Sequence, residues 1–512
     1  GALGLVHRGF DTVVKPNMEK PLIESGCVSC GQCVSVCPTG ALQERTTMIK
    51  ETPVDTVETD TTCSYCSVGC SLKLESYGDM LIKANPDKQG TVNAGLACGK
   101  GKWGFDCSML ENKLEEPLIK SGSDFREADY HEALVLIAKR CQSIGAKCGK
   151  DAIGVAVSDR YTNEEAFAIK KMAETMGAKI FSMNNRASGI ADVLGFDASP
   201  NTIDELLSTN MILAVGFNTT DNPVIELKMK QAAEAGAKVV LVNPEDYVQH
   251  IDFLNKAVYT KNDLSFLKEV AKAVVDSGRG AGVDGYEEFA ASVKDVTVSD
   301  DAKAVADMYL EAKKAMIVFN QNLITTEAAS LLADIALISG HIGTPRDGIL
   351  QVKAKNNSQG LVDLGITAGA EELEGVKALV VFGEEADIDT DTLEFLAVSD
   401  THMTALAAKA DVVIPGTGFA STDGTYTNTE RRLQLVQAAI EEDVELANWE
   451  IAAEIAHVFE VDYEWENTED ISVAMNDEVP AYKYAVVDEV LGGVLKPADD
   501  ARLAVIGDAK FA

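Results

Sequence analysis

The spacing of apolar residues changes along this chain of 512 residues. Over residues 1–53 they are scattered between Gly and Cys, without helical periodicity, and residues 54–110 keep frequent Cys. Farther on, short apolar runs alternate with stretches whose apolar residues recur every three or four positions. Such runs predict strands, and such stretches predict helices.

The predicted elements follow one another as βαβ units. Strands are predicted at residues 153–157, 211–215, 238–242, 315–319, 378–382, 395–398 and 411–415, and helices around 163–176 and 223–235. Residues 258–312 look helical and charged, and the tail after about residue 461 is acidic and weakly patterned. Repeated βαβ units predict parallel sheets, so we expect two Rossmann-like α/β domains after the Cys-rich segments.

Charge and hydropathy narrow the choice of compartment and partner. With 45 basic and 81 acidic residues, the formal net charge is −36, which repels nucleic acid and anionic lipid. No apolar run approaches the roughly 18 residues of a membrane helix, and the first residues lack a signal peptide. We therefore expect a cytoplasmic protein without a transmembrane segment. The chain also lacks an initiator Met, as a fragment or a processed product would.

Eight of the 11 cysteines lie between Cys27 and Cys98, which favours metal ligation in a reducing compartment. The first array has the spacing of the bacterial ferredoxin run and ends in Pro: Cys27-x2-Cys30-x2-Cys33-x3-Cys37-Pro38. A zinc site or free thiols are the alternatives. In two-cluster ferredoxins the fourth Cys serves the other cluster. Cys37 therefore belongs either to the local cluster or to a second one completed by residues before Gly1 or by a partner chain.

The second array is Cys63-x2-Cys66-x3-Cys70-x27-Cys98, followed by Gly99, Lys100 and Gly101. Four thiolates complete a [4Fe–4S] site, and a zinc site with four cysteines is the alternative. Together the two arrays predict N-terminal ferredoxin-like and [4Fe–4S] segments ahead of the α/β domains.

Residues 56–110 resemble the [4Fe–4S] domain of the molybdopterin (Mo/W-bis-pterin) oxidoreductases, which include the formate dehydrogenase large subunit and the large iron–sulfur subunit of respiratory complex I. The resemblance extends over roughly residues 1–460. Its further motifs are Asn163–Glu165, Gly216–Asn218, Asn356–Gly360 and Asp423–Arg432. It implies ferredoxin-like residues 1–53, a [4Fe–4S] domain at 54–110, a molybdopterin oxidoreductase domain at 111–150 and 313–460, an inserted α/β domain at 151–312 and a tail at 461–512.

The resemblance also implies cofactor contacts. Lys100 stands where family members place a lysine between the cluster and a pterin. The residues implied for the pterin, which would be molybdopterin guanine dinucleotide, are Lys100, Gly216, Asn218, Asn356, Asn357, Gln359 and Gly360. The motif loops are equally explained as turns that hold the fold.

One part of the family pattern is missing. Formate dehydrogenases ligate their metal through a Cys or selenocysteine followed by His, and neither residue occurs at residues 186–189, the corresponding place. Ser188 is the one side chain there that could ligate molybdenum. The family's C-terminal capping domain is not recognisable. We therefore predict no catalytic residue.

The resulting hypothesis is an iron–sulfur electron-transfer subunit of an NAD(P)H- or ferredoxin-linked complex. It would pass single electrons between clusters and assemble with flavin- or NAD(P)H-binding and iron–sulfur subunits, with ferredoxin as a further partner. The alternative is a catalytic molybdenum or tungsten enzyme such as the formate dehydrogenase alpha subunit. A zinc-stapled scaffold without redox activity is a third possibility.

Overall fold

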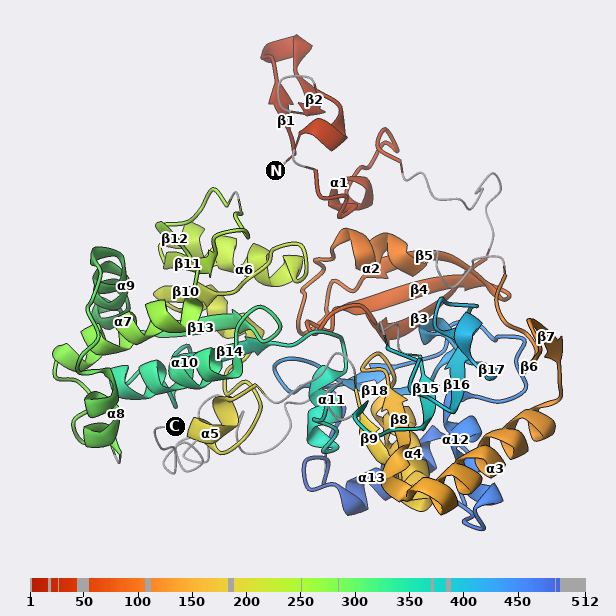
Figure 1. The fold of residues 1–512 in the computed structure, drawn as a ribbon. Coiled ribbons are helices and arrows are strands. Elements are labelled where there is room, and N and C mark those ends of the chain that lie inside the picture. The colour runs from red at the N-terminus through yellow and green to blue at the C-terminus, as the bar shows by residue number, and fades with distance from the viewer. Residues whose placement is uncertain are drawn as a thin grey trace.

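The computed structural model describes residues 2–16, 20–25, 27–43, 55–105, 112–182, 188–249, 251–283, 285–369, 373–383, 388–483 and 485–488. These residues form two α/β lobes, a smaller antiparallel sheet between them, and an N-terminal segment that stands above the rest in Figure 1. The predicted fold class is confirmed: the N-terminal iron–sulfur segments precede two sheets that are wholly or largely parallel.

The N-terminal segment has little structure of its own. Strands β1 (Leu3–Val6) and β2 (Val13–Pro16) pair as an antiparallel hairpin, and the short helix α1 (Gln32–Ser35) follows. The hairpin leaves large apolar side chains in solvent, among them Leu5 and Phe10. It is packed only loosely, because a two-stranded hairpin cannot bury both of its faces.

The next segment is a three-stranded antiparallel sheet with a short helix. Its elements are β3 (Val57–Thr62), β4 (Ser71–Tyr77), β5 (Met80–Pro86) and α2 (Gly99–Trp103). Alternate residues of β4 are buried, as expected of a strand with one face against a core. Three cysteines of the second array lie in the β3–β4 connection, and Cys98 is the N-cap residue of α2.

One lobe is built on a seven-stranded sheet with the order β7-β6-β17-β16-β15-β8-β9. Its strands are β6 (Leu118–Ser121), β7 (Asp124–Glu127), β8 (Ile153–Val157), β9 (Lys179–Phe181), β15 (Ala378–Phe382), β16 (Phe395–Asp400) and β17 (Val412–Pro415). The last five are parallel to one another. One face is covered by α3 (Tyr130–Cys148), α4 (Asn163–Met176), α12 (Asn448–Val458) and α13 (Thr468–Glu478).

The other lobe holds a five-stranded, fully parallel sheet with the order β12-β11-β10-β13-β14. Its strands are β10 (Met211–Val215), β11 (Lys238–Pro244), β12 (Lys256–Thr260), β13 (Ala315–Asn320) and β14 (Gly348–Val352). The helices of this lobe are α5 (Ile190–Leu194), α6 (Pro223–Glu234), α7 (Asp263–Asp276), α8 (Tyr286–Val293), α9 (Asp300–Glu311) and α10 (Thr326–Ser339). α6 packs on one face, and α7, α9 and α10 on the other.

Strand pairing divides the chain at other points than the sequence led us to expect. β8 and β9, expected in the inserted domain at 151–312, belong to the seven-stranded sheet, where β8 pairs with β15 and β9 pairs with β8. β13 and β14, expected in the domain at 313–460, belong to the five-stranded sheet. The reason is that a βαβ pattern in the sequence predicts a strand and its neighbouring helix, but it does not show which sheet the strand joins.

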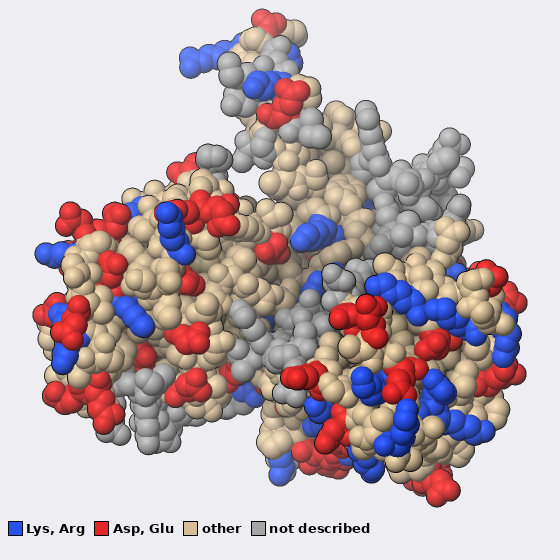
Figure 2. All heavy atoms as spheres, viewed as in Figure 1, with Lys and Arg blue, Asp and Glu red and all other residues tan. Residues whose placement is uncertain are grey.

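Three further elements lie beside the seven-stranded lobe, and one of them reaches the small sheet. α11 (Ser358–Asp363) follows β14, and the hairpin β18 (Gly424–Thr427) with β19 (Leu433–Val436) packs on β3. Acidic and basic side chains are spread over both lobes on the face in Figure 2 rather than gathered in one patch. Within the described ranges, no helix combines the length and apolar character needed to cross a bilayer.

Candidate metal centre

The first array lies on a loop that leads into α1. Cys27 and Cys30 precede the helix, Cys33 lies within it and Cys37 follows it, and all four are half-buried. Gly31 adopts φ 70° at the start of α1, a left-handed conformation that glycine adopts without strain. The backbone N–H of Leu42 and the Thr39 hydroxyl lower the pKa of Cys37 to about 7, which favours the thiolate that iron requires.

The second array is more deeply buried. Cys63 and Cys70 are 5% and 7% exposed, and the backbone N–H of Cys63 donates to the Cys70 carbonyl at 2.9 Å. A Cβ atom on Gly101 would lie 3.4 Å from the Cys63 Sγ atom, so α2 approaches this sulfur closely. The β3–β4 loop and α2 therefore bring the four cysteines of the array together, with Cys63 and Cys70 buried and the other two half-buried.

The thiols of the second array act on one another electrostatically. Burial, and next the negative charge of neighbouring thiolates, raise the pKa values of Cys63 and Cys70, and burial raises the pKa of Cys66 to about 11. Cys98 contributes to each of these shifts. Gathered thiolates are unfavourable without a cation between them, and iron supplies the compensating charge. This donor set fits an iron–sulfur cluster.

Three cations lie near the second array and oppose these shifts. Arg160 lowers the pKa of Cys63, Lys100 that of Cys66 and Lys228 that of Cys70. They come from the loop after β8, from α2 and from α6. The array thus receives positive charge from both lobes as well as from its own segment.

The loop between Cys66 and Cys70 is clamped by the β18–β19 hairpin. The Gln434 side chain donates to the Gly69 carbonyl at 2.8 Å, and the Asn428 side chain donates to the Val68 carbonyl at 3.0 Å. The backbone N–H of Thr429 donates to the Ser67 carbonyl at 2.7 Å. Asn428 and Thr429 belong to the motif Asp423–Arg432, so part of that motif positions the cysteine loop.

The two arrays are in direct contact. The Trp103 indole N–H donates to the Ser29 carbonyl at 2.5 Å, and the Gln32 side chain donates to the Gly95 carbonyl at 2.9 Å. A Cβ atom on Gly99 would lie 3.3 Å from the Val28 carbonyl oxygen. The loop of the first array therefore packs on the residues that flank Cys98.

A site for a single metal ion needs a different arrangement of ligands from a site for a cluster. In the part of the chain that the structure describes, no three His, Cys, Asp or Glu side chains are grouped to hold one metal ion. A zinc ion needs its ligands within about 2.3 Å of one point. A [4Fe–4S] cluster instead takes four cysteine thiolates, one on each of its iron atoms.

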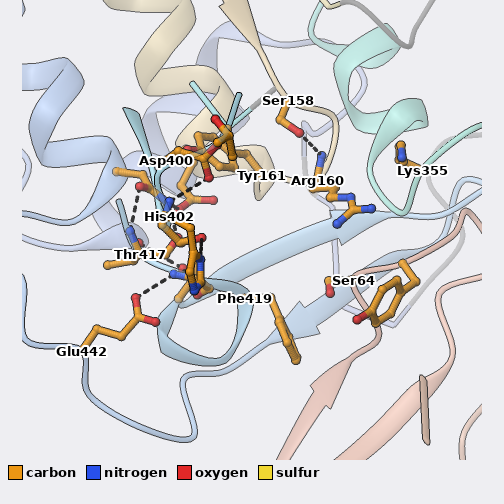
Figure 3. Close-up of a pocket in the computed structure, with 18 of the residues that line it drawn as sticks. Ser64, Ser158, Arg160, Tyr161, Lys355, Asp400, His402, Thr417, Phe419 and Glu442 are labelled. Atoms are coloured by element: carbon orange, nitrogen blue, oxygen red, sulfur yellow. Dashed lines mark hydrogen bonds between the residues drawn. The ribbon is translucent and has the colours of Figure 1, made fainter. Parts of the chain in front are cut away.

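A cavity of about 500 Å³ opens at the carboxyl ends of the parallel strands β8, β15, β16 and β17, beside Ser64 and Tyr65 of the cysteine loop. Figure 3 shows Arg160 and Lys355 on one side and Asp400, His402 and Glu442 on the other. Parallel sheets usually bind ligands at this edge. The cations Lys113, Arg160 and Lys355 suit phosphate groups, although Lys113 pairs with Glu442.

The predicted pterin residues lie elsewhere, and none of them lines this cavity. Asn357 is fully buried, donates to the Tyr161 carbonyl at 2.8 Å and accepts the Thr427 N–H at 2.8 Å. A Cβ atom on Gly360 would lie 2.1 Å from Asn163 Oδ1, so this glycine permits close packing. These residues join α11, α4 and β18, as expected of turns that hold the fold.

The other residues predicted to contact the pterin differ in burial and in hydrogen bonding. Asn356 and Gln359 are buried, and Asn356 Oδ1 and Gln359 Oε1 have no hydrogen-bond partner among the described residues. Asn218 and Gly216 follow β10, and the Asn218 side chain bonds Asp221 and Tyr247. Lys100 is exposed on α2. A pterin role for these residues stays a prediction.

Ser188 is buried and its hydroxyl donates to Asp197 at 2.7 Å. Asp197 pairs in turn with Lys353 at 3.2 Å, and the Lys353 side chain is 0% exposed. Although burial opposes it, the Lys353 ammonium holds the pKa of Asp197 below its usual value. In this arrangement the hydroxyl considered for molybdenum is held by a carboxylate. Residues 186 and 187 lie outside the described residues.

Sequence reasoning missed several residues around the arrays. Arg160 and Lys355 could have been found, because they follow β8 and β14 at strand ends where ligands bind. Lys102, which is 1% exposed and donates to the Ala84 carbonyl at 2.9 Å, carries no such signal. Asn222 and Lys228 reach the second array only through the packing of α6.

Comparison with known proteins gives three family matches. The model described as molybdopterin oxidoreductase matches residues 113–458, that of the molybdopterin oxidoreductase Fe4S4 domain matches residues 56–107, and that of the 4Fe-4S binding domain matches residues 21–43. The first match alone spans more than half of the chain. The second and third contain all eight cysteines of the arrays.

Relatives and a solved structure agree with these matches. The chain is 24% identical to the "Probable oxidoreductase YjgC" of Bacillus subtilis (strain 168) and 26% identical to a "Putative formate dehydrogenase" of Staphylococcus aureus (strain Mu50), each over 92% of this chain and 60% of the relative. It therefore spans about three fifths of the length of these relatives. Acetylene hydratase from Pelobacter acetylenicus shares the fold, with a TM-score of 0.65, 14% identity, and coverage of 80% of this chain and 71% of that one.

Proposed function

Because the chain belongs to the molybdopterin oxidoreductase family, we propose that it serves there as an iron–sulfur electron-transfer subunit, passing single electrons between [4Fe–4S] clusters at its two cysteine arrays. When bound, such clusters would supply one-electron redox chemistry. The ligands would be Cys63, Cys66, Cys70 and Cys98 for one cluster, and Cys27, Cys30, Cys33 and Cys37 for the other or for parts of two.

The observation that carries this proposal is the contact between the arrays. The hydrogen bonds Trp103–Ser29 and Gln32–Gly95 hold the first loop against the segment that ends in Cys98. Short separation between redox centres is what a chain of one-electron steps requires. A zinc-stapled scaffold would have no need for such contact.

The chain's own residues give the two sites different surroundings. In the second array Cys63 and Cys70 are buried, whereas Cys66 and Cys98 are half-buried. Gln434 and Asn428 clamp the loop that carries three of these cysteines. The first array is half-buried and lies beside the exposed hairpin. Solvent exposure and hydrogen bonds to sulfur tune cluster potentials, so the two clusters should differ in potential.

The test is elemental and spectroscopic. Anaerobically purified chain is assayed for Fe, sulfide, Zn, Mo and W, and its EPR spectrum is recorded after dithionite reduction. We expect iron and sulfide for at least two clusters and a spectrum broadened by spin coupling between them. Cys98→Ala should remove one signal and the broadening, whereas Cys148→Ala, at an exposed cysteine outside the arrays, should leave both. A folded chain without iron would refute the proposal.

We further propose that this chain exchanges electrons with flavin- or NAD(P)H-binding subunits, with ferredoxin as a further donor or acceptor, in the cytoplasm. The family resemblance and the position of the half-buried first array beside the exposed hairpin support this, because an outer cluster needs a partner within electron-transfer range. Anaerobic mixing with a co-purifying flavin subunit should allow NAD(P)H to reduce the clusters. NAD(P)H alone should not reduce them.

A catalytic molybdenum or tungsten enzyme is the second candidate, and the cavity at the sheet edge favours it. Arg160 and Lys355 there could bind the phosphates of molybdopterin guanine dinucleotide, and relatives carry formate dehydrogenase names. Mo or W at one atom per chain in the same elemental assay would favour this candidate. Iron and sulfide alone would favour the electron-transfer role.

A further inference from the structure

Helix α2 lies between the two cysteine arrays and contacts both of them. On the side of the second array, a Cβ atom on Gly101 would lie 3.4 Å from Cys63 Sγ. Toward the first array, the Trp103 ring lies against Gly31, where a Cβ atom would meet Trp103 Cζ2 at 3.0 Å. The Trp103 indole N–H also donates to the Ser29 carbonyl at 2.5 Å. Trp103 therefore holds the loop of the first array on a helix of the second.

Ser29 connects Trp103 to a cysteine sulfur of the first array. Its carbonyl accepts the indole N–H of Trp103, and its own backbone N–H donates to Cys27 Sγ at 3.4 Å. Ser29 also directly precedes Cys30 in the chain. Two hydrogen bonds and one residue thus link α2 to the Cys27 sulfur.

The backbone of Ser29 adopts an unfavourable conformation. Its φ is 54°, in the left-handed region, which is roughly 5- to 30-fold less populated for a residue other than glycine. A hydrogen bond such as that from Trp103 favours the bonded arrangement about fivefold and so offsets much of this penalty. Because φ sets the direction of the N–H relative to the carbonyl, a return to negative φ would break one of the two bonds. The contact with Trp103 therefore supports the bond to Cys27.

We propose that Trp103 is a positioning residue that raises the reduction potential of the cluster bound by Cys27, because it holds the Ser29 N–H against the Cys27 sulfur. This inference rests on the proposed function. One-electron reduction, by the other cluster or by dithionite, adds a negative charge to the cluster and forms or breaks no covalent bond. An N–H donor to a ligand sulfur stabilises the more negative, reduced state. Because such coupling is reciprocal, reduction should in turn tighten the loop on α2.

The experiment is a redox titration of the full chain, prepared anaerobically with its clusters, with dithionite as reductant and EPR as readout. Trp103→Phe keeps an aromatic ring beside Gly31 but removes the indole N–H. Ser29→Gly removes the conformational penalty, because glycine populates positive φ about as readily as negative φ. The matched control is Trp465→Phe, where the Trp465 ring stacks on Tyr463 with 4.4 Å between ring centroids. The potential of the second cluster serves as an internal reference.

We expect Trp103→Phe to lower the equilibrium constant for reduction of the first cluster about tenfold, the size of a hydrogen bond to a charged group. For a one-electron couple this corresponds to about 59 mV. Ser29→Gly alone and Trp465→Phe should each change this constant less than about threefold, below the effect of one typical hydrogen bond. Adding Ser29→Gly to Trp103→Phe should recover part of the loss, because the N–H then faces the sulfur without help from the indole.

A second readout follows the loop itself. Native hydrogen exchange of residues 27–37, measured by mass spectrometry, reports how often this segment opens. Exchange should be faster in Trp103→Phe than in the wild type. In the wild type it should be slower in the reduced than in the oxidised protein, as the reciprocal coupling requires.

The outcomes separate the inference from the proposed function. Both clusters present with an unchanged first potential in Trp103→Phe would overturn the inference and leave the electron-transfer role standing. Equal shifts of both clusters would also overturn it, because the effect would then not pass through Ser29. Should Trp103→Phe lose the first cluster, the variant that also carries Ser29→Gly decides: a regained cluster supports the inference, and a missing one contradicts it. Wild-type protein that is folded but free of iron would refute the proposed function itself.

Discussion

Replacing Gly69 by Ala should cause loss of the cluster at the second array, whereas the cluster at the first array should remain bound. Gly69 has φ 67°, and a Cβ atom there would lie 1.9 Å from Gln434 Oε1 and 2.9 Å from Asn428 Cβ. Both separations are far inside the roughly 3.5–4.0 Å at which carbon atoms pack. The loop between Cys66 and Cys70 would therefore have to leave the β18–β19 hairpin.

The magnitude follows from two costs. A non-glycine residue in the left-handed region costs about 1–2 kcal/mol, and forcing a methyl group into packed surroundings costs a further ~1–3 kcal/mol. Gly78 provides the matched control, because it has φ 57° with nothing within 4 Å of its Cβ position. Gly78→Ala should bear only the first cost. The difference of about 1–3 kcal/mol reduces the population of the closed loop roughly 5- to 140-fold.

The assay is iron and sulfide content together with the EPR signal of each cluster after anaerobic purification. Gly69→Ala should lose the second signal, and Gly78→Ala should retain both. The double variant Gly69→Ala/Gln434→Ala removes the nearest clashing atom and should recover part of the lost signal. Full occupancy in Gly69→Ala, or no recovery in the double variant when Gln434→Ala alone is occupied, would refute the clamp.

Three further predictions concern buried groups. Lys353→Met should lower the free energy of unfolding by about 3–5 kcal/mol, because the buried Asp197 carboxylate loses its cation. Adding Asp197→Leu should restore much of this free energy, as denaturant titration can measure. The pKa of Asp197 is held below its usual value, so the Asp197–Lys353 pair stabilises the folded protein above about pH 4. This contribution is lost as the pH falls through the folded-state pKa of Asp197. Below pH 4 the wild type should therefore lose stability faster than the Lys353→Met/Asp197→Leu variant. Burial raises the pKa of Cys141 to about 12, so in the native protein iodoacetamide should label exposed Cys148 and spare Cys141 in a mass-spectrometric assay.

Local pattern was enough for seven strands of the two large sheets and for helices α4 and α6. The helix expected around residues 163–176 is α4, and the strands expected at 153–157 and 211–215 are β8 and β10. β12 escaped prediction because it is an edge strand with only one fully buried residue, which leaves no apolar run. β14 is buried, but Gly348 and Gln351 interrupt its apolar pattern.

In the candidate site, too, the features set by local sequence were predicted and those set by tertiary packing were not. Cysteine spacing is local and pointed to both arrays, whereas the surroundings of the sulfurs come from residues far away in the sequence. Asn222, Lys228 and Gln434 reach the second array through tertiary packing, and no periodicity or motif around them reports that contact. In the motif loop at Asn356–Gly360, the Asn357 side chain joins elements of the fold, and the pterin role of the loop stays a prediction.

The hydrogen bonds that clamp the cysteine loop also determine when, during synthesis of the chain, this loop can reach its final structure. The Gln434–Gly69 bond spans 365 residues, so the ribosome must add that length after the loop has emerged before its partner exists. At about 5–20 residues per second, this takes roughly 20–70 s. During that interval Cys63, Cys66 and Cys70 are without their final support. Loading of metal at this loop is thereby tied to synthesis of the chain as far as Gln434, and the nascent thiols need a reducing environment until then.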